Sequence, residues 1–211
     1  MGCFMSVHNS CVGRLEVICG PMFSGKSEEL IRRMRRAQIA KLQTQLFKHC
    51  LDNRKTIDKV HAHNGASLAA IPVDSAEMIE QLIISETEVV GIDEAQWFSP
   101  NLVLIIDKLV SAHKRVIVTG LDLDFRGIPF GCMPVLMALA DEVVKLKSVC
   151  MQTGKEAPCS QRLVNGAPAK HTDPVVLVGA EECYEARARD CYEIDRKPLS
   201  EYLEQHFPSE T

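Results

Sequence analysis

Short apolar runs alternate with amphipathic helical stretches along the first two thirds of the chain. Five runs have the length and apolar content of buried strands: residues 14–19, 42–48, 69–73, 88–92 and 115–119. Helical spacing of apolar positions covers 26–37, 75–84, with Asp74 or Ser75 as its cap, and 102–112. Because strands and helices alternate up to about Ala140, we expect an α/β fold on a parallel sheet with right-handed crossovers.

The pattern changes after Val149, where helical periodicity fades and cysteine, glycine and proline accumulate. A short β-like run follows at 175–178, and residues 199–206 have the spacing of a terminal helix. The earlier polar stretch 51–66 indicates a loop. The expected organisation is a disordered extension at 1–12, a larger α/β domain at 13–149, a small loop-rich domain at 150–194 and a tail or helix at 195–211.

Composition excludes some classes of function. Of the 211 residues, 46% are hydrophobic and 25% charged, and the net charge is −4, which is typical of a soluble globular protein. A weakly acidic chain is a poor candidate for nucleic-acid binding, which needs clustered lysine and arginine. No apolar run spans a bilayer and no secretory pattern opens the chain, so we expect a cytoplasmic protein without a membrane partner. The nine scattered cysteines then indicate reduced thiols or metal ligands.

An eight-residue motif follows the first predicted strand. It matches G-x-x-x-x-G-K-[ST] in full and consists of Gly20, Pro21, Met22, Phe23, Ser24, Gly25, Lys26 and Ser27. In such a loop, backbone N–H groups surround phosphate oxygens, the lysine reaches the β- and γ-phosphates, and the hydroxyl ligates Mg²⁺. The strand before it and the helix after it supply the required context. The motif therefore predicts binding of ATP and Mg²⁺, and a glycine-rich turn with an incidental lysine is the less favoured alternative.

An acidic pair ends the predicted strand at 88–92. Asp93 stands at the carboxyl end of that strand, where ligands bind in an open α/β sheet, and is expected to hold Mg²⁺ with Ser27. Glu94 follows at the turn and can accept the proton of an acceptor hydroxyl. With Ala95 and Gln96 the pair also resembles a helicase box. A helicase needs two motor domains and a basic groove, and this chain has neither the length nor the charge for them.

Further motifs along the chain resemble one family. They are Asp52-Asn53-Arg54, Gly120-Leu121-Asp122-Leu123-Asp124-Phe125-Arg126-Gly127 with Pro129-Phe130-Gly131, Gln161-Arg162-Leu163, and Val178-Gly179-Ala180 with Tyr184-Glu185. With the phosphate loop and the acidic pair, they resemble the thymidine kinase family of bacteria and the vertebrate cytosol, from about Gly13 to Cys191. The resemblance implies a P-loop NTPase-like parallel sheet with a small C-terminal zinc-ribbon or lasso-like domain.

The resemblance also implies roles for individual residues. Glu94 is the expected base, and Asp52 and Arg54 line the active site, where Arg54 steadies the acceptor oxygen or the moving phosphate. The residues that match those around the thymine ring are Met22, Leu121, Phe125 and Phe130. A lasso loop at about 160–184 closes over the nucleoside, with matching positions at Ser160, Val175, Leu177, Gly179 and Tyr184. Without the resemblance, the two phenylalanines are as compatible with a core as with a site.

The region that holds a structural zinc in this family is incomplete here. Zinc needs four ligands, which the family supplies as two Cys-x-x-Cys or Cys-x-x-Cys/His pairs. The corresponding segments read Cys150-Met151-Gln152-Thr153 and Ala188-Arg189-Asp190-Cys191, so each lacks one cysteine. Cys159 and Cys183 lie in the region but away from the matching positions. We therefore expect no tight structural zinc, with Cys150 and Cys191 as small buried residues.

The resemblance implies a thymidine kinase of pyrimidine salvage that uses ATP and Mg²⁺. Family members are commonly homotetramers that the end-product triphosphate inhibits. Two alternatives stay open: a related deoxynucleoside kinase with a shifted base preference, such as for deoxyuridine, and a non-catalytic nucleotide-binding relative. The intact Lys26, Ser27, Asp93 and Glu94 argue against the second alternative.

Overall fold

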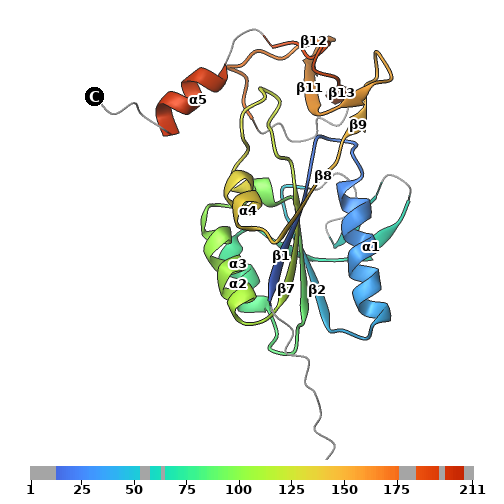
Figure 1. The fold of residues 1–211 in the computed structure, drawn as a ribbon, viewed down its shortest axis with the longest axis vertical. Coiled ribbons are helices and arrows are strands. Elements are labelled where there is room, and N and C mark those ends of the chain that lie inside the picture. The colour runs from blue at the N-terminus through green and yellow to red at the C-terminus, as the bar shows by residue number, and fades with distance from the viewer. Residues whose placement is uncertain (1–12, 53–57, 63–64, 176–183, 195–197, 207–211) are drawn as a thin grey trace, which may run out of the picture.

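The computed structural model describes residues 13–52, 58–62, 65–175, 184–194 and 198–206. Its centre is a six-stranded sheet in the order β5-β2-β6-β7-β1-β8, in which all neighbouring strands are parallel (Figure 1). The strands are β1 (Arg14–Cys19), β2 (Thr44–His49), β5 (Ile71–Val73), β6 (Val89–Asp93), β7 (Arg115–Gly120) and β8 (Glu142–Lys145). The predicted α/β fold with a parallel sheet is thus confirmed.

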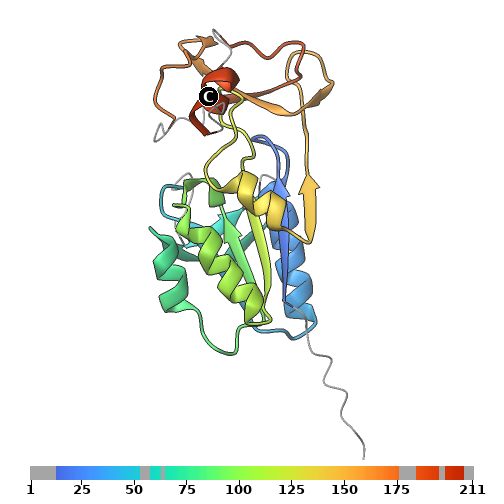
Figure 2. The ribbon, with the colours of Figure 1, turned by 60° about the vertical axis from the view of Figure 1, so that its left-hand side comes forward.

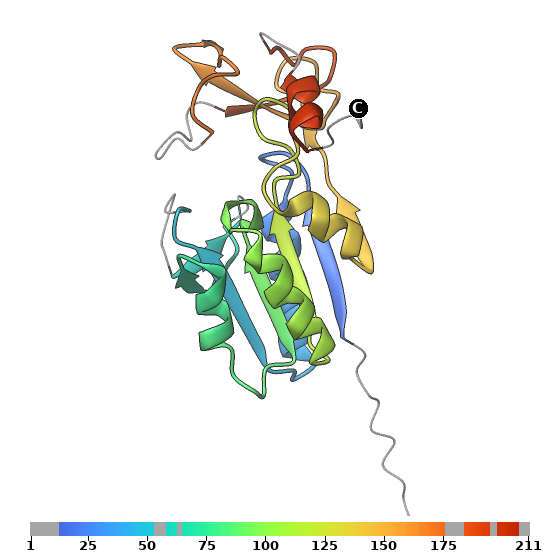
Figure 3. The same ribbon diagram turned by 90° about the vertical axis from the view of Figure 1, so that its left-hand side faces the viewer.

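Helices cover both faces of this sheet. α1 (Lys26–Ile39) packs on one face, and α2 (Ala76–Leu82), α3 (Asn101–Ser111) and α4 (Met133–Leu139) pack on the other, as Figures 1 and 3 show. Two apolar clusters fill the layers. One joins α1 to the sheet, and the other joins α2, α3 and α4 to its opposite face. Because both faces are covered, most residues of the central strands are apolar, which explains their clear signal in the sequence.

Three details of the predicted elements were wrong. The predicted loop 51–66 contains a strand, β3 (Lys59–His61), which pairs antiparallel with β4 (Ser67–Ala69). The predicted strand 69–73 is in fact β4 and β5, separated at Ala70. The sheet also extends past Ala140 to β8, whose residues alternate between half-buried and exposed because β8 lies at the edge. These short strands lack a continuous apolar run, since each buries only part of its side chains.

The C-terminal part forms smaller sheets beyond the carboxyl ends of the parallel strands (Figures 1 and 2). β9 (Ser148–Val149) pairs with β10 (Glu156–Ala157), and β11 (Cys159–Val164) lies between β12 (Ala167–Pro168) and β13 (Tyr184–Arg187). The last helix, α5, spans Pro198–His206. Of the β-like run at 175–178, only Val175 is among the described residues, and it lies in a bend. No helix in the described part of the chain is long and apolar enough to cross a membrane.

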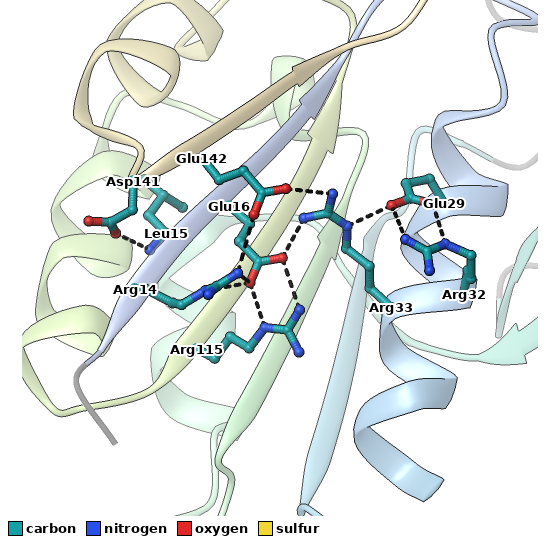
Figure 4. A network of polar contacts seen from close by, with 9 residues as sticks. All are labelled: Arg14, Leu15, Glu16, Glu29, Arg32, Arg33, Arg115, Asp141 and Glu142. Atoms are coloured by element: carbon teal, nitrogen blue, oxygen red, sulfur yellow. Dashed lines mark hydrogen bonds and ion pairs between the residues drawn. The ribbon is translucent and has the colours of Figure 1, made fainter. Parts of the chain in front are cut away.

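A network of ion pairs connects the edge of the sheet to α1 (Figure 4). The Glu16 side chain on β1 is fully buried and accepts from Arg33 Nη1 at 2.5 Å and from Arg115 Nε at 2.6 Å. Arg33, on α1, also donates to Glu142 of β8 at 2.8 Å. Burial alone raises the pKa of a carboxyl, but the hydrogen bonds and charges of Arg115 and Arg33 outweigh it and lower the pKa of Glu16 to about 2.

Glu16→Gln is expected to lower the free energy of unfolding by about 3 kcal/mol, because it removes the carboxylate that these two partly buried guanidinium groups share. The pKa of Glu16 in the folded chain lies below the ordinary value of 4.5. Its contribution is therefore complete above pH 4.5 and is lost as the pH falls towards 2. Urea unfolding at several pH values measures both effects, and the variant should lose less stability than the wild type over this range.

Glu142→Gln is the matched control, since that carboxylate is half-exposed and pairs with the same Arg33. Its cost should stay below about 1 kcal/mol. Equal pH slopes for the wild type and Glu16→Gln would contradict the assignment.

Candidate active site

The carboxyl ends of three adjacent strands bring the predicted phosphate and metal residues together. β6, β7 and β1 are neighbours in the sheet, and their register pairs Ile92 with Val118 and Cys19 with Gly120. The loop after β1, the acidic pair after β6 and the residues after Gly120 therefore emerge side by side. This edge is where open α/β sheets bind their ligands.

The loop after β1 has the backbone of a phosphate cradle. Gly20 has φ +141°, and a Cβ there would lie 2.4 Å from the carbonyl oxygen of Leu146. Gly25 is in the left-handed region and is the N-cap residue of α1. The Ser24 hydroxyl and Lys26 Nζ both donate to the Pro21 carbonyl, at 2.8 and 2.7 Å. The cradle thus lies at the N-terminus of the 14-residue helix α1, and the Lys26 side chain lies across the loop.

The two residues predicted to hold Mg²⁺ face each other. Ser27 Oγ lies 3.5 Å from Asp93 Oδ2, and Asp93 is almost fully buried at the end of β6. Thr119, on the neighbouring strand β7, donates its hydroxyl to Asp93 Oδ1. A hydroxyl and a carboxylate beside a phosphate cradle form the oxygen donor set that Mg²⁺ prefers, so these residues fit the ion. Sequence reasoning missed Thr119, whose signal is a single hydroxyl at the end of an aliphatic strand.

Glu94 leaves the strand in an uncommon backbone conformation. Its φ is 58° and its ψ 44°, in the left-handed region, and a short 3₁₀ helix, η1 (Ala95–Trp97), follows it. Such a conformation is uncommon and strained in a residue other than glycine. Because of this turn, the Glu94 side chain does not follow the alternating side-chain directions of strand β6, although the residue stays largely buried.

The Gln96 side chain holds this carboxylate in place. Its Nε2 donates to Glu94 Oε2, and its Oε1 accepts from the Leu121 backbone N–H at 3.0 Å. Close packing around it requires Gly120, because a Cβ there would lie 2.5 Å from Met133 Sδ and 2.9 Å from Gln96 Oε1. Gln96 was predicted to bind ATP, and the structure gives it contacts to Glu94 and Leu121. Ala95, predicted with it, is buried in the core.

Asp52 and its surroundings lie at the end of β2. Lys48 Nζ forms an ion pair with Asp52 Oδ2 at 2.9 Å, and both side chains are buried. Sequence reasoning missed Lys48, which is paired with Asp93 in the strand register. Burial lowers the pKa of the nearby His49, and its Nδ1 accepts from the Leu51 N–H, so the ring is neutral near pH 7. Arg54 lies outside the described residues.

The predicted base-binding residues that the structure describes have different surroundings. Phe125 is only 5% exposed, and its ring lies under the guanidinium groups of Arg162 and Arg126. Phe130 is edge-on to Trp97, with ring centroids 5.0 Å apart. Ser160 Oγ accepts from the Met22 N–H at 2.9 Å and so joins the lasso loop to the phosphate loop. Leu177 and Gly179 lie outside the described residues, whereas Val175 and Tyr184 lie inside them.

The zinc region contains two facing thiols. Cys150 Sγ and Cys191 Sγ are 3.2 Å apart, beside a small cluster that includes Ala157, Ala186 and Ala188. Cys150 is buried as expected, but Cys191 is only partly buried. Within the described ranges, no group of three or more His, Cys, Asp or Glu side chains is placed to hold a metal. Two sulfurs do not fit a tetrahedral zinc site, which needs four ligands.

We expect the purified wild-type protein to carry far less than one zinc per chain after extensive dialysis. The double variant Thr153→Cys/Ala188→Cys completes the ligand set at the two matching positions, so it should gain about one zinc per chain when supplied with the ion. Mass spectrometry of the metal content measures both. A stoichiometric zinc in the wild type would overturn this expectation.

The chain is similar to known proteins over most of its length. The sequence model of the thymidine kinase family matches residues 13–192. Among solved structures, the flagellar accessory protein FlaH from Methanocaldococcus jannaschii is similar at 15% identity, with a TM-score of 0.47 over 68% of this chain and 75% of that chain. The family match covers both the parallel sheet and the small sheets, whereas the structural likeness is too distant to indicate an activity.

Proposed function

The chain belongs to the thymidine kinase family, and from this membership we propose that it transfers the γ-phosphate of ATP to the 5′-hydroxyl of thymidine. The products are thymidine monophosphate and ADP. The observation that carries the proposal is that a phosphate cradle, the Ser27–Asp93 pair and Glu94 all lie at one edge of the sheet. Phosphoryl transfer between a nucleotide and a hydroxyl needs these three elements together.

The phosphate loop binds and orients the donor. Backbone N–H groups at the start of α1 and the Lys26 ammonium group are suited to the phosphate oxygens. Ser27 and Asp93 would hold Mg²⁺, which when bound neutralises charge on the phosphates. Thr119 donates to Asp93 and thereby leaves its second oxygen directed towards Ser27. The donor is thus positioned by residues from three adjacent strand ends.

Glu94 accepts the proton of the acceptor hydroxyl. The Gln96 amide donates to Glu94 Oε2 and so helps to fix the orientation of the carboxylate that takes up this proton. Gln96 is itself held by the Leu121 N–H, which fixes the amide orientation. The protein therefore has to supply one correctly oriented proton acceptor and groups that stabilise the negative charge on the phosphates.

In this proposal the nucleoside base binds beside Phe125 and Phe130, which match residues around the thymine ring in the family. Phe130 can hold a flat base by stacking or by an edge contact, and the largely buried Phe125 by an edge contact. Within the same proposal, the protein is cytoplasmic, assembles as a homotetramer and is inhibited by the end-product triphosphate. The preference for thymidine over deoxyuridine depends on the surroundings of a single methyl group.

The test is a product assay with ATP, Mg²⁺ and a panel of nucleosides. Thymidine, deoxyuridine, deoxycytidine, uridine and deoxyguanosine are supplied singly, and the monophosphates are separated by chromatography. We expect thymidine to have the highest kcat/KM and the purine nucleoside to be a poor substrate. Omission of Mg²⁺ should abolish product. Preference for deoxyuridine would move the assignment to the related kinase, and no product despite ATP binding would support the non-catalytic relative.

A further inference from the structure

Arg162 is a buried cation without an acidic partner among the described residues. Its side chain, on β11, is among the largest fully buried ones, and it forms no ion pair in the described part of the chain. Its Nη1 donates to the carbonyl of Pro174, and its Nε has no hydrogen-bond partner within the described ranges. A buried guanidinium that is neutralised so incompletely costs stability, and a hydrophobic residue of similar volume is often at least as stable there. Its neighbours among the described residues are instead an aromatic ring and a carbonyl, an arrangement that fits a positioning role.

Three parts of the proposed nucleoside pocket meet at this side chain. The guanidinium lies over the Phe125 ring, 5.1 Å from its centroid. Its bond to Pro174 holds the residue directly before Val175. In the sheet, Arg162 is paired with Tyr184 of β13. Phe125, Val175 and Tyr184 are three of the residues proposed to surround the base, and they come from segments far apart in the chain.

The rest of the Phe125 environment comes from the segment after β13 and from the loop of Phe125 itself. The Tyr192 hydroxyl donates to the Phe125 carbonyl, and Arg126, from the same loop as Phe125, lies farther from the ring, at 5.8 Å. The backbone of Phe125 is thus held by Tyr192, while Arg162 covers the face of its ring. Only a planar guanidinium combines stacking on an aromatic ring with directional donation to a carbonyl, which a lysine ammonium cannot reproduce.

We propose that Arg162 is a positioning residue for nucleoside binding: it holds the Phe125 ring and the backbone at Pro174 in one arrangement and thereby sets the affinity for thymidine. The inference rests on the proposed function and names a residue that acts through Phe125 and Pro174. The buried charge of Arg162 lowers the free energy of unfolding. It also preorganises the residues that contact the nucleoside, which lowers the entropic cost of binding.

The test compares Arg162→Met with the wild type. Methionine has a similar length and no charge, so the fold should be kept and the melting temperature should be unchanged or higher. We expect KM for thymidine to rise about tenfold or more, with kcat within about threefold and KM for ATP unchanged, since the ring stacking and the hydrogen bond of Arg162 serve only nucleoside affinity. Arg162→Lys should restore affinity only in part, because it keeps the charge without the planar group.

Binding is also measured without turnover. Trp97 is the only tryptophan of the chain and lies against Phe130, so its fluorescence can report thymidine binding directly. Arg187→Met is the matched control: Arg187 is a buried arginine of the same small sheet, but it pairs with Glu185 and donates to the Cys191 carbonyl. This control should lower the melting temperature and leave the Kd for thymidine within about twofold of the wild type.

The outcomes separate the inference from the proposed function. If the wild type binds thymidine and the Arg162→Met variant binds it with an equal Kd, the inference alone is overturned. A parallel loss of ATP affinity and melting temperature in that variant overturns it too, because the role is then structural. A wild type that binds another nucleoside overturns the thymidine assignment, and the same comparison is then decided with that nucleoside. A wild type that binds none overturns both.

Discussion

Glu94→Gln is expected to lower kcat by about 10²-fold or more, with little change in KM for ATP or thymidine. The amide has the size of the carboxylate and can still accept the hydrogen bond from Gln96 through its oxygen, so the side chain should stay in place. It cannot take up the proton of the 5′-hydroxyl. The loss should therefore appear in the chemical step and hardly at all in binding.

Initial rates of thymidine monophosphate formation measure this effect, and Trp97 fluorescence checks that the nucleoside still binds. Glu80→Gln is a suitable control, since Glu80 is an exposed carboxylate on α2 that pairs with Lys108, away from the sheet edge. The control should keep the wild-type rate. If Glu94→Gln kept more than about a third of the wild-type kcat, another group would have to be the proton acceptor.

Lys26→Met is expected to reduce kcat/KM for ATP by about 10²-fold or more. Lys26 is the cation of the phosphate loop, and its Nζ now rests on the Pro21 carbonyl, within the cradle itself. Methionine keeps the length of the side chain but removes both the charge and the donors. The charge that develops on the phosphate oxygens during transfer then lacks the cation of the loop.

Steady-state kinetics with varied ATP, together with the shift in melting temperature caused by ATP and Mg²⁺, measure the loss in binding and in chemistry. Lys41→Met is the matched control, because Lys41 is exposed in the turn after α1, and it should behave as the wild type. Unaltered kinetics in Lys26→Met, with the fold intact by circular dichroism, would show that the Lys26 ammonium group has no part in catalysis.

The sequence alone determined those features whose cause is local. The phosphate loop is a contiguous motif, because a tight turn, a glycine with positive φ and a helix start must follow one another directly. Asp93 and Glu94 are visible for the same reason, since they end a continuous apolar strand. The central strands were predicted because burial on both faces makes them largely apolar.

Tertiary structure decided every feature whose partners are distant in the chain. Thr119 meets Asp93, and Arg162 meets Phe125 and Pro174, only because separate segments pack side by side. The hairpin β3–β4 and the edge strand β8 gain their hydrogen bonds from such packing, and their short, half-polar sequences carry little signal of it. A strand register and the surroundings of a buried cation depend on segments that are distant in the chain. The hydrophobic pattern of a single segment therefore does not predict them.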